Sequence, residues 1–338
     1  MTRHDEMMNF LNSHLSAGFR VESLAGDASF RRYHRIYFKL AEDADGREIS
    51  YLLMDAPPQK ESVDLFLAIA DVMSEAVNVP DILAKDVARG FLLLQDFGTV
   101  EFAHLIKPNS DNNDIYHQAL ATLRDIQSID VQDDKVLPYD DDKFAVEMNL
   151  FTEWFLPYIG ERMSDELWDN LKNTVIADIQ TQPKVLVHRD YHSRNLMQDK
   201  NSDKLGVIDF QDALIGPYTY DLVSLVRDAY IDVDENWVNA QIHHFYDLIE
   251  SDVSLMDFTK EVNIMGIQRH LKVLGIFIRL YQRDGKDRYL ANIPKVMQDL
   301  LIELHWLVEH EAHPIYKEFL AFIQNIMPSY EAKFKVTV

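Results

Sequence analysis

Two short apolar runs near the middle of the chain, VLVHRD (185–190) and KLGVIDF (204–210), enclose a strongly polar stretch. Runs of this length that are rich in β-branched residues are typical of strands, whereas YHSRNLM between them holds basic, hydroxyl and amide side chains. Within the segment, His188-Arg189-Asp190 is followed after four residues by Asn195. The chain must therefore fold so that a polar loop is presented beside strands.

The spacing of this loop, His-Arg-Asp followed after four residues by Asn, serves phosphoryl transfer. Asp190, at the mouth of a strand, can accept the proton of an attacking hydroxyl group, and Arg194 can help to neutralise charge. Asn195 can turn its amide oxygen toward Mg²⁺, and Asp209 at the end of the next strand adds a carboxylate oxygen. Because Mg²⁺ also takes phosphate oxygens and water, two protein ligands suffice. We predict Asp190 and Arg194 as catalytic residues and Asn195 and Asp209 as metal ligands.

The two histidines of the loop raise the alternative of a zinc site. His188 and His192 stand four residues apart, as zinc ligands do on a helix, but no glutamate follows the first histidine and no third ligand is apparent. The flanking runs are strand-like, which is unfavourable for a helix. We expect His188 to order the loop backbone and His192 to lie near a substrate.

A second Asp-Phe motif, Asp96-Phe97-Gly98, precedes the polar loop. The metal-binding aspartate is expected after the polar loop, and this motif precedes the loop. We therefore assign metal binding to Asp209 in the later Asp-Phe-Gln segment. Following the apolar strand FLLL, the first motif is suited to a hinge between lobes whose backbone could hydrogen-bond adenine. Gln95 and Phe97 are therefore expected to bind the nucleotide.

The first third of the chain predicts a small sheet. Alternation of polar and apolar residues on both sides of AGDAS indicates a hairpin, YLLMDAPP a third strand, and VPDILAKDVARGFLLLQDFG two further strands around Arg89-Gly90. Helical spacing of apolar residues predicts helices over 1–17 and 63–75.

Beyond Gly98 the pattern becomes helical. Helices are expected over 113–129, 143–158 and 164–180, and from 220 to 336 with breaks at Pro294, Pro314 and Pro328. The fold class expected is α+β: a small β-rich nucleotide-binding lobe with an antiparallel sheet and one crossing helix over residues 1–97, and a larger, mostly helical lobe with the polar loop and substrate site over 98–338.

Charge and composition exclude several kinds of partner. The formal net charge of −23 opposes a broad electrostatic grip on nucleic acid or on an anionic membrane surface. The chain has no cysteine, and its N-terminal stretch lacks the apolar core of a signal peptide. We expect a cytoplasmic protein, monomeric or weakly dimeric, that binds neither nucleic acid nor membranes.

Taken together, these motifs resemble those of the aminoglycoside phosphotransferase/choline kinase superfamily, whose fold is protein-kinase-like. The matching segments are His188 with Asp190, Asn195-Leu196, Ile208-Asp209, and YDLVSL with Asp221. The resemblance covers nearly the whole chain. It implies ATP and Mg²⁺ as cofactors, a two-lobed kinase-like fold, and a structural role for Asp221 in supporting the loop.

More narrowly, several blocks in order resemble bacterial amino-sugar kinases of cell-wall recycling: LAGDASFRRYHRI, LLMDAPP, GFLLLQDFG, VHRDYHSRNLM and QRHLKVLGIF. That resemblance implies an ATP-dependent kinase that phosphorylates the anomeric hydroxyl of N-acetylmuramate or N-acetylglucosamine. Two alternatives stay open: a phosphotransferase for another small hydroxylated molecule (an aminoglycoside, choline or homoserine), and a pseudokinase that binds nucleotide without chemistry.

The pseudokinase alternative arises because a lysine expected on the third strand is missing. Kinases use that lysine to hold the α- and β-phosphates, whereas YLLMDAPP offers Met54 and Asp55 there. Either Arg31 or Arg32 could supply the charge, beside a small-residue loop expected to cover the triphosphate. The loop residues predicted to bind the nucleotide are Gly26, Asp27 and Ser29.

Substrate recognition rests on the segment from Gln268 to Arg283, which has helical periodicity. One face of that helix carries Arg269, Lys272, Arg279 and Arg283. This face is either solvated or turned to the cleft, where Arg269 could meet a carboxylate such as the lactyl group of muramate. His192, Asp212 and Arg269 are the residues expected to contact the substrate.

Overall fold

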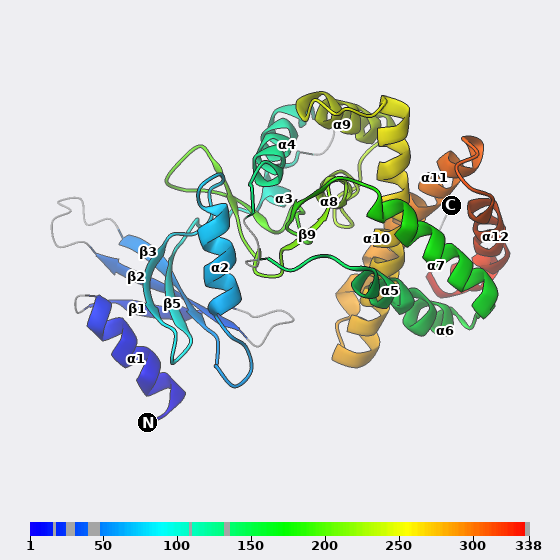
Figure 1. The fold of residues 1–338 in the computed structure, drawn as a ribbon. Helices are drawn as coiled ribbons and strands as arrows, with labels where there is room; N and C mark the ends of the chain where they lie inside the picture. Colours follow the sequence, from blue (N-terminus) through cyan, green and yellow to red (C-terminus); the bar gives the residue numbers. More distant parts are fainter. Residues whose placement is uncertain (16–17, 25–30, 40–47, 108–109, 132–135, 335–338) are drawn as a thin grey trace. The chain divides into compact units, whose positions relative to one another are not determined.

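The computed structural model describes residues 1–15, 18–24, 31–39, 48–107, 110–131 and 136–334. The chain divides into two compact units, one formed by residues 1–104 with 195–212 and the other by 105–194 with 213–338 (Figure 1). We call them the N-terminal unit and the C-terminal unit. Along the chain, the first change of unit falls within the short helix α3 (Phe102–Leu105), after His104.

The N-terminal unit is built on a five-stranded antiparallel sheet of order β1-β2-β3-β5-β4. Strand β5 is an interior strand, and its first four residues are fully buried, which explains its continuous apolar run. Besides the start of α3, the other elements among the described residues of this unit are two helices and a separate hairpin. Their bounds are α1 (Arg3–His14), β1 (Arg20–Ser23), β2 (Arg32–Lys39), β3 (Glu48–Asp55), α2 (Asp64–Met73), β4 (Ile82–Asp86), β5 (Phe91–Gln95), β7 (Leu196–Gln198) and β8 (Leu205–Val207).

Helix α1 covers part of this sheet. Thr2 and Asp5 form a capping box at its start, which satisfies backbone donors that the first turn leaves open. Met7, Phe10 and Leu11 pack in one apolar cluster with side chains of β2, β3 and β5. The β4–β5 turn requires Gly90, because its φ is +69° and a Cβ there would meet the carbonyl oxygen of Ala56 at 1.9 Å.

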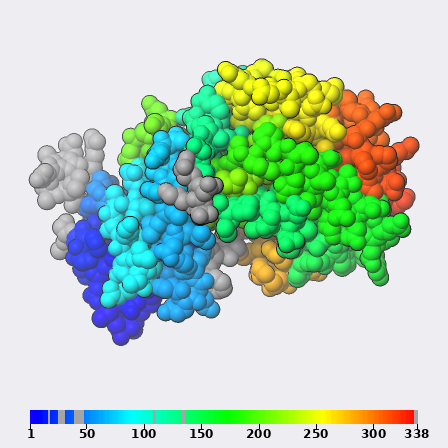
Figure 2. Space-filling view, in the orientation of Figure 1, coloured from blue at the N-terminus to red at the C-terminus, as the bar shows by residue number. Residues whose placement is uncertain are grey.

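The described residues of the C-terminal unit are mostly helical and include a two-stranded ladder. Its elements are α4 (Asn113–Gln127), α5 (Asp141–Leu150), η1 (Phe151–Phe155), α6 (Leu156–Ile159), α7 (Asp165–Gln180), β6 (Lys184–Val187), β9 (Leu214–Pro217), α8 (Tyr220–Val226), α9 (Glu235–Leu248), α10 (Leu255–Asp284), η2 (Asp287–Asn292), α11 (Ile293–Glu309) and α12 (Pro314–Phe334). The outer face of α7, drawn in green, lies open at the surface of this unit (Figure 2).

Helix α10 is the central element of the C-terminal unit and packs against α5, α7, α8 and α11. The Ser254 side chain caps its N-terminus, and Gly285 in the left-handed region ends it. Gly275 allows a close approach to α5, since a Cβ there would lie 2.3 Å from the Leu150 carbonyl. Within the described residues, no helix is both long enough and apolar enough to cross a membrane.

The expected α+β architecture is confirmed, with an antiparallel sheet early in the chain and helices later. The helical segment predicted over 143–158 is confirmed, because α5, η1 and α6 follow one another without a gap; the π-helical turn η1 ends two residues before Pro157, which has no N–H to donate. One local prediction was wrong. Pro328 does not break α12, because buried Ile326 and Tyr330 on either side keep that turn packed.

The strands around the polar loop do not pair with each other. β6 pairs with β9, whereas β8 pairs with β7 in a hairpin whose register matches Leu196 with Val207. The polar segment therefore runs from β6 of the C-terminal unit into β7 of the N-terminal unit. This pairing assigns Asp190 to one unit and Asn195 to the other.

Candidate active site

The β7–β8 hairpin brings the two predicted metal ligands to the same end of one ladder. Asn195 precedes β7, Asp209 follows β8, and the backbone nitrogen of Ile208 donates to the carbonyl oxygen of Asn195 at 3.0 Å. Asp209 is exposed, and its φ of +64° lies in the left-handed region, which is uncommon for a residue other than glycine. Gln211 Nε2 donates to Asp209 Oδ1 at 2.9 Å and so orients the carboxylate.

These residues fit a magnesium ion by the chemistry of their donors. An amide oxygen and a carboxylate oxygen are hard ligands, and Mg²⁺ completes its shell with phosphate and water. Among the described residues, no group of three or more histidine, aspartate or glutamate side chains gathers as a protein-only metal site would. Asn195 and Asp209 therefore suit a metal that arrives with a phosphate ligand.

The loop after β6 is held by backbone hydrogen bonds to buried carboxylates. Asp221, at the start of α8, accepts from the backbone nitrogens of His188 at 2.6 Å and Arg189 at 3.0 Å. His188 is buried, and its Nδ1 accepts from the backbone nitrogen of Asp190 at 3.3 Å. The expectations that Asp221 supports the loop and that His188 orders its backbone are confirmed.

The second half of the loop is fixed by Asp228, which the sequence analysis missed. Asp228 Oδ2 accepts from the backbone nitrogen of Ser193 at 2.9 Å. Arg194 is exposed, and its guanidinium lies over the ring of Tyr230 at 3.6 Å. The ring of His192 packs edge-on against the same tyrosine. The predicted residues His192 and Arg194 therefore share one aromatic neighbour.

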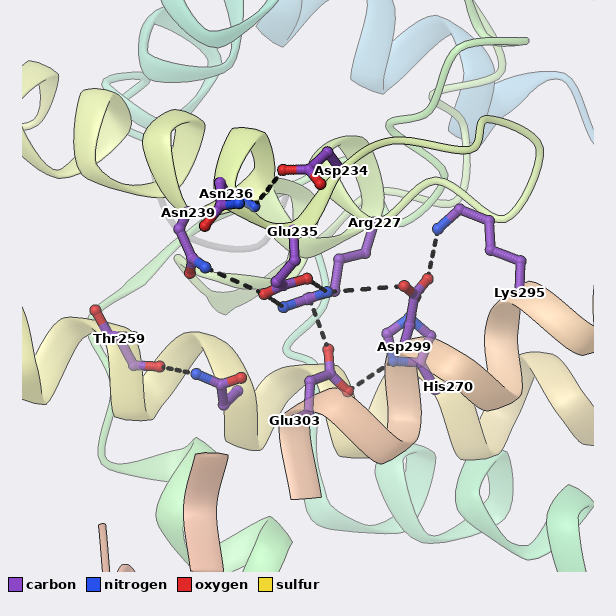
Figure 3. Close-up of polar contacts among 11 residues, drawn as sticks. Arg227, Asp234, Glu235, Asn236, Asn239, Thr259, His270, Lys295, Asp299 and Glu303 are labelled. Atoms are coloured by element: carbon purple, nitrogen blue, oxygen red, sulfur yellow. Dashed lines mark hydrogen bonds and ion pairs between the residues drawn. The ribbon is translucent and has the colours of Figure 1, made fainter. Parts of the chain in front are cut away.

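A buried ionic network anchors the chain next to Asp228 (Figure 3). The Arg227 guanidinium binds both oxygens of Glu235 at 2.8 Å; its Nη1 lies 3.7 Å from Asp299 Oδ1 and its Nε lies 3.2 Å from Glu303 Oε1. Lys295 binds Asp299 at 2.6 Å. Helices α9 and α11 thereby fix the residue that precedes Asp228.

Asp190 is partly buried among cationic groups. Burial acts to raise the pKa of Asp190, but Lys272, His192, Arg269 and His188 together hold it below its ordinary value. A carboxylate of low pKa is ionised at neutral pH, so it can accept a hydrogen bond and then a proton from a hydroxyl group.

The cationic face of α10 is buried where it meets the loop. Arg269 and Lys272 are each 7% exposed, so the interpretation of this face as solvated was wrong for both. Arg269 Nη1 donates to the carbonyl oxygen of Arg189 at 3.2 Å. Lys272 Nζ donates to the Tyr220 hydroxyl at 2.9 Å. A contact of Arg269 with substrate remains a prediction.

Several predicted nucleotide-binding residues lie in the N-terminal unit. Gly26, Asp27 and Ser29 lie outside the described residues. Phe97 is buried and packs on Gly206, where a Cβ would lie 2.3 Å from the phenyl ring. Gln95 ends β5, and its Oε1 accepts from the backbone nitrogen of Asp81 at 3.3 Å.

Asp96 of the first Asp-Phe motif is a buried ionic centre. Its carboxylate binds Arg35 Nε at 2.9 Å, Lys200 Nζ at 3.2 Å and the backbone nitrogen of Gly98 at 3.0 Å, and it accepts a hydrogen bond from Ser50. Burial acts to raise the pKa of Asp96, but Ser50, Gly98 and Arg35 lower it below its ordinary value. This carboxylate joins β2 and β3 to the segment after β5.

Near the strand position where a lysine was expected, charged side chains form ion pairs with one another. Asp55 at the end of β3 is buried and accepts from Arg3 Nε at 2.8 Å. Arg31 is also buried and forms an ion pair with Glu61, which precedes α2. Arg32, the other predicted candidate, is exposed.

Glu147 on α5 is a further loop contact that the sequence analysis missed. It accepts from Arg189 Nη2 at 2.6 Å. A signal was available, because Glu147 lies between Phe144 and Met148 on the apolar face of a helix. A carboxylate at such a position needs a buried cationic partner.

Comparison with known proteins identifies relatives of this chain. Residues 20–252 match the model of the phosphotransferase enzyme family. An N-acetylmuramate/N-acetylglucosamine kinase of Pseudomonas aeruginosa is 38% identical over 287 residues, which cover 82% of this chain and 81% of that protein. The enzyme of the same name from Neisseria meningitidis is 37% identical over 314 residues, covering 89% and 90%.

Solved structures share the fold at low sequence identity. An ethanolamine kinase of Plasmodium vivax aligns with a TM-score of 0.58 at 11% identity, covering 89% of this chain and 84% of that one. A choline kinase of Cryptosporidium parvum aligns with a TM-score of 0.59 at 10% identity, covering 93% and 99%. With the kinase-like fold and the family match in agreement, the chain belongs to the phosphotransferase enzyme family.

Proposed function

We propose that this chain is an ATP-dependent kinase that phosphorylates the anomeric hydroxyl of N-acetylmuramate, N-acetylglucosamine or both. The observation that carries the proposal is the ionised carboxylate of Asp190, held on a buttressed loop in a chain whose relatives bear the name of that kinase. A binding module without chemistry has no need of such a base.

In the proposed reaction, Asp190 orients the sugar hydroxyl and accepts its proton as the oxygen attacks the γ-phosphorus. The new P–O bond forms as the bond to the leaving ADP breaks, and the negative charge on the leaving oxygen is retained by ADP. Most of the rate enhancement comes from positioning and charge stabilisation, because phosphoryl transfer needs little covalent assistance.

Asn195 and Asp209 would hold Mg²⁺, which when bound offsets negative charge on the phosphate oxygens. Arg194 would neutralise charge on the transferring group. Gln95, the last residue of β5, and Phe97 would contact adenine through their backbone atoms. His192, Asp212 and Arg269 are the proposed substrate residues, and Asp212 is exposed at the surface of the N-terminal unit, as a substrate contact requires.

The test uses the purified protein with ATP, Mg²⁺ and a panel of acceptors that includes both amino sugars, an aminoglycoside, choline and homoserine. ADP release measures turnover, and phosphorus NMR of the product locates the phosphate. Transfer to an oxygen other than the anomeric one would overturn the proposed acceptor. Absence of Mg²⁺-dependent ADP release with every acceptor would favour a pseudokinase.

The role of Asp190 is tested by Asp190→Ala, which should lower kcat by about 10²- to 10⁴-fold while ATP binding is retained. Asp165→Ala is the matched control, because the Asp165 side chain is 91% exposed on α7. Turnover of Asp190→Ala equal to that of the control would contradict the assignment of the base.

A further inference from the structure

Among the described residues, four side chains form hydrogen bonds or ion pairs with the carboxylate of Glu147 on α5. Arg189 Nη2 lies 2.6 Å from Oε1, Lys272 Nζ lies 3.0 Å from Oε1, and Gln268 Nε2 lies 3.2 Å from Oε2. The hydroxyl of Tyr139 also donates to Oε2. These residues form the Glu147 cluster, which joins α5 and α10 to the loop after β6.

The negative charge of Glu147 stabilises the two cationic side chains of the cluster. Burial acts to raise the pKa of Glu147, but Lys272 and Arg189 lower it below its ordinary value, so the group is ionised. It offsets two buried cations whose repulsion would otherwise act at short range. Removing the negative charge would leave Lys272 and Arg189 incompletely neutralised, which is costly in a buried environment.

The cluster acts on a residue whose backbone is strained. Arg189 has a φ of +76°, a conformation that costs an L-residue about 1–2 kcal/mol. The backbone nitrogen of Arg189 donates to Asp221, and its carbonyl oxygen accepts from Arg269. Its guanidinium donates to Glu147. Asp190 is the next residue, so the direction of its side chain depends on the conformation kept at Arg189.

We propose that Glu147 is a positioning residue for phosphoryl transfer: by holding the side chain of Arg189, it keeps the Asp190 carboxylate in the orientation that receives the proton. This inference rests on the proposed function of Asp190. Glu147 itself touches no reacting atom in this mechanism and acts through Arg189.

A positioning role differs from a purely structural one in what it changes. Loss of position should lower kcat and leave the KM for ATP nearly unchanged, because nucleotide binding is assigned to the N-terminal unit. Glu147→Gln removes the charge and keeps the shape of the side chain. We expect kcat to fall about 10- to 100-fold, the loss that a displacement of about 1 Å can cause, with a change in KM for ATP below about 3-fold.

The matched control is Glu261→Gln. Glu261 is a partly buried carboxylate on α10 and, like Glu147, it accepts a hydrogen bond from a tyrosine, here Tyr218. Its substitution should leave kcat and KM within about 2-fold of the unmodified protein, as expected for a change outside the site.

A double-mutant cycle tests whether Glu147 acts through Arg189. Arg189→Met should lower kcat as much as Glu147→Gln does, and the double variant should lose no more than about 3-fold beyond either single change. Arg189 is 23% exposed at its side chain, so its substitution tests the same contact even where the glutamate variant folds poorly. Losses that multiply in the double variant would overturn the proposal.

A readout without substrate separates this inference from the proposed function. Amide hydrogen exchange of the peptide covering residues 186–193 should be faster in Glu147→Gln than in Glu261→Gln, because the loop loses an anchor. If the unmodified protein phosphorylates no acceptor, the proposed function fails and the exchange result still tests the cluster. Exchange and kcat both equal to those of Glu261→Gln would overturn the positioning role.

Discussion

His270 Nδ1 lies 2.7 Å from Glu303 Oε2 in the interior of the C-terminal unit, and both side chains are buried (Figure 3). Burial lowers the pKa of His270 to about 3, while burial raises the pKa of Glu303 well above its ordinary value. Burial therefore disfavours the charged form of both groups, so His270 is neutral at neutral pH and the protonated form of Glu303 is favoured. Around it, the cations Arg227 and Lys295 balance the other carboxylates of the network, Glu235 and Asp299.

This pair predicts a pH dependence of stability. In the unfolded chain, histidine titrates near about 6.5 and glutamate near about 4.3. Between these values, while folded Glu303 keeps its proton, each state holds one proton on the pair, so stability is level. Above about pH 6.5 the unfolded chain has lost both protons, so stability falls with rising pH over the range in which folded Glu303 still keeps its proton, by up to about 1.4 kcal/mol per pH unit. Below about pH 4.3 the unfolded chain binds two protons, so stability also falls with acid.

The variant that isolates this effect is Glu303→Gln. Its amide can donate to His270 Nδ1 but does not titrate, so the alkaline decline contributed by the pair should disappear. Urea unfolding at pH values from about 7 to 9 measures the slope, and only the difference from the unmodified protein matters. Asp165→Asn, at an exposed carboxylate, is the control. Equal slopes in Glu303→Gln and the control would contradict the protonated form of Glu303 in the folded state.

Mutation of the aspartates of the two Asp-Phe motifs should have different effects: loss of stability at Asp96, and weaker Mg²⁺-dependent ATP binding at Asp209. Asp96 is buried with Arg35 and Lys200, whereas Asp209 is exposed at a hairpin end. Asp96→Asn should lower the free energy of unfolding by about 3–5 kcal/mol, the cost of breaking a buried ion pair. Asp209→Asn should change stability by less than about 1 kcal/mol, because it is exposed, yet weaken Mg²⁺-dependent binding of ATP.

The measurement is a pair of titrations on each variant: urea unfolding, and ATP binding with and without Mg²⁺. The Mg²⁺ concentration at half-maximal ATP binding should be unchanged in Asp96→Asn and raised in Asp209→Asn. A raised Mg²⁺ requirement in Asp96→Asn alone would reverse the two assignments.

Local patterns were enough to predict most elements, because periodicity and turn residues act over short distances. The strands of the N-terminal sheet and the helices near 113–127 and 165–180 follow from such patterns. The β6–β9 and β7–β8 pairings do not, since strands of three or four residues carry no register information of their own.

The loop residues were predicted by spacing, but their supports were not. Asp221 follows a recognisable segment, whereas Glu147 and Asp228 meet the loop through contacts distant in sequence. Periodicity also cannot distinguish a solvated cation from a buried one with a carboxylate partner. Lys272 was therefore described only as part of a helix face, although it lies 3.0 Å from Glu147.

Arg31 is the better placed of the two arginines predicted to replace the missing lysine. It is buried and paired with Glu61, as a phosphate-binding lysine in kinases is paired with a glutamate. Burial raises the pKa of Tyr33, Arg31 opposes that rise and Asp209 adds to it, so Tyr33 lies within electrostatic reach of both. From the burial of Arg31 and its pairing with Glu61, we infer that its guanidinium meets the phosphate oxygens of a bound nucleotide.

We therefore expect Arg31→Met to raise the Kd of ATP and ADP by about 10- to 100-fold, as loss of a charge-assisted hydrogen bond would. The Kd of adenosine should be unchanged, because adenosine has no phosphate. Arg32→Met is the matched control and should alter ATP binding by less than about 3-fold, since an exposed arginine contributes little. Isothermal titration calorimetry with the three ligands checks this. An equal rise in the Kd of adenosine and of ATP would mean that Arg31 stabilises the structure of the N-terminal unit and does not bind phosphate.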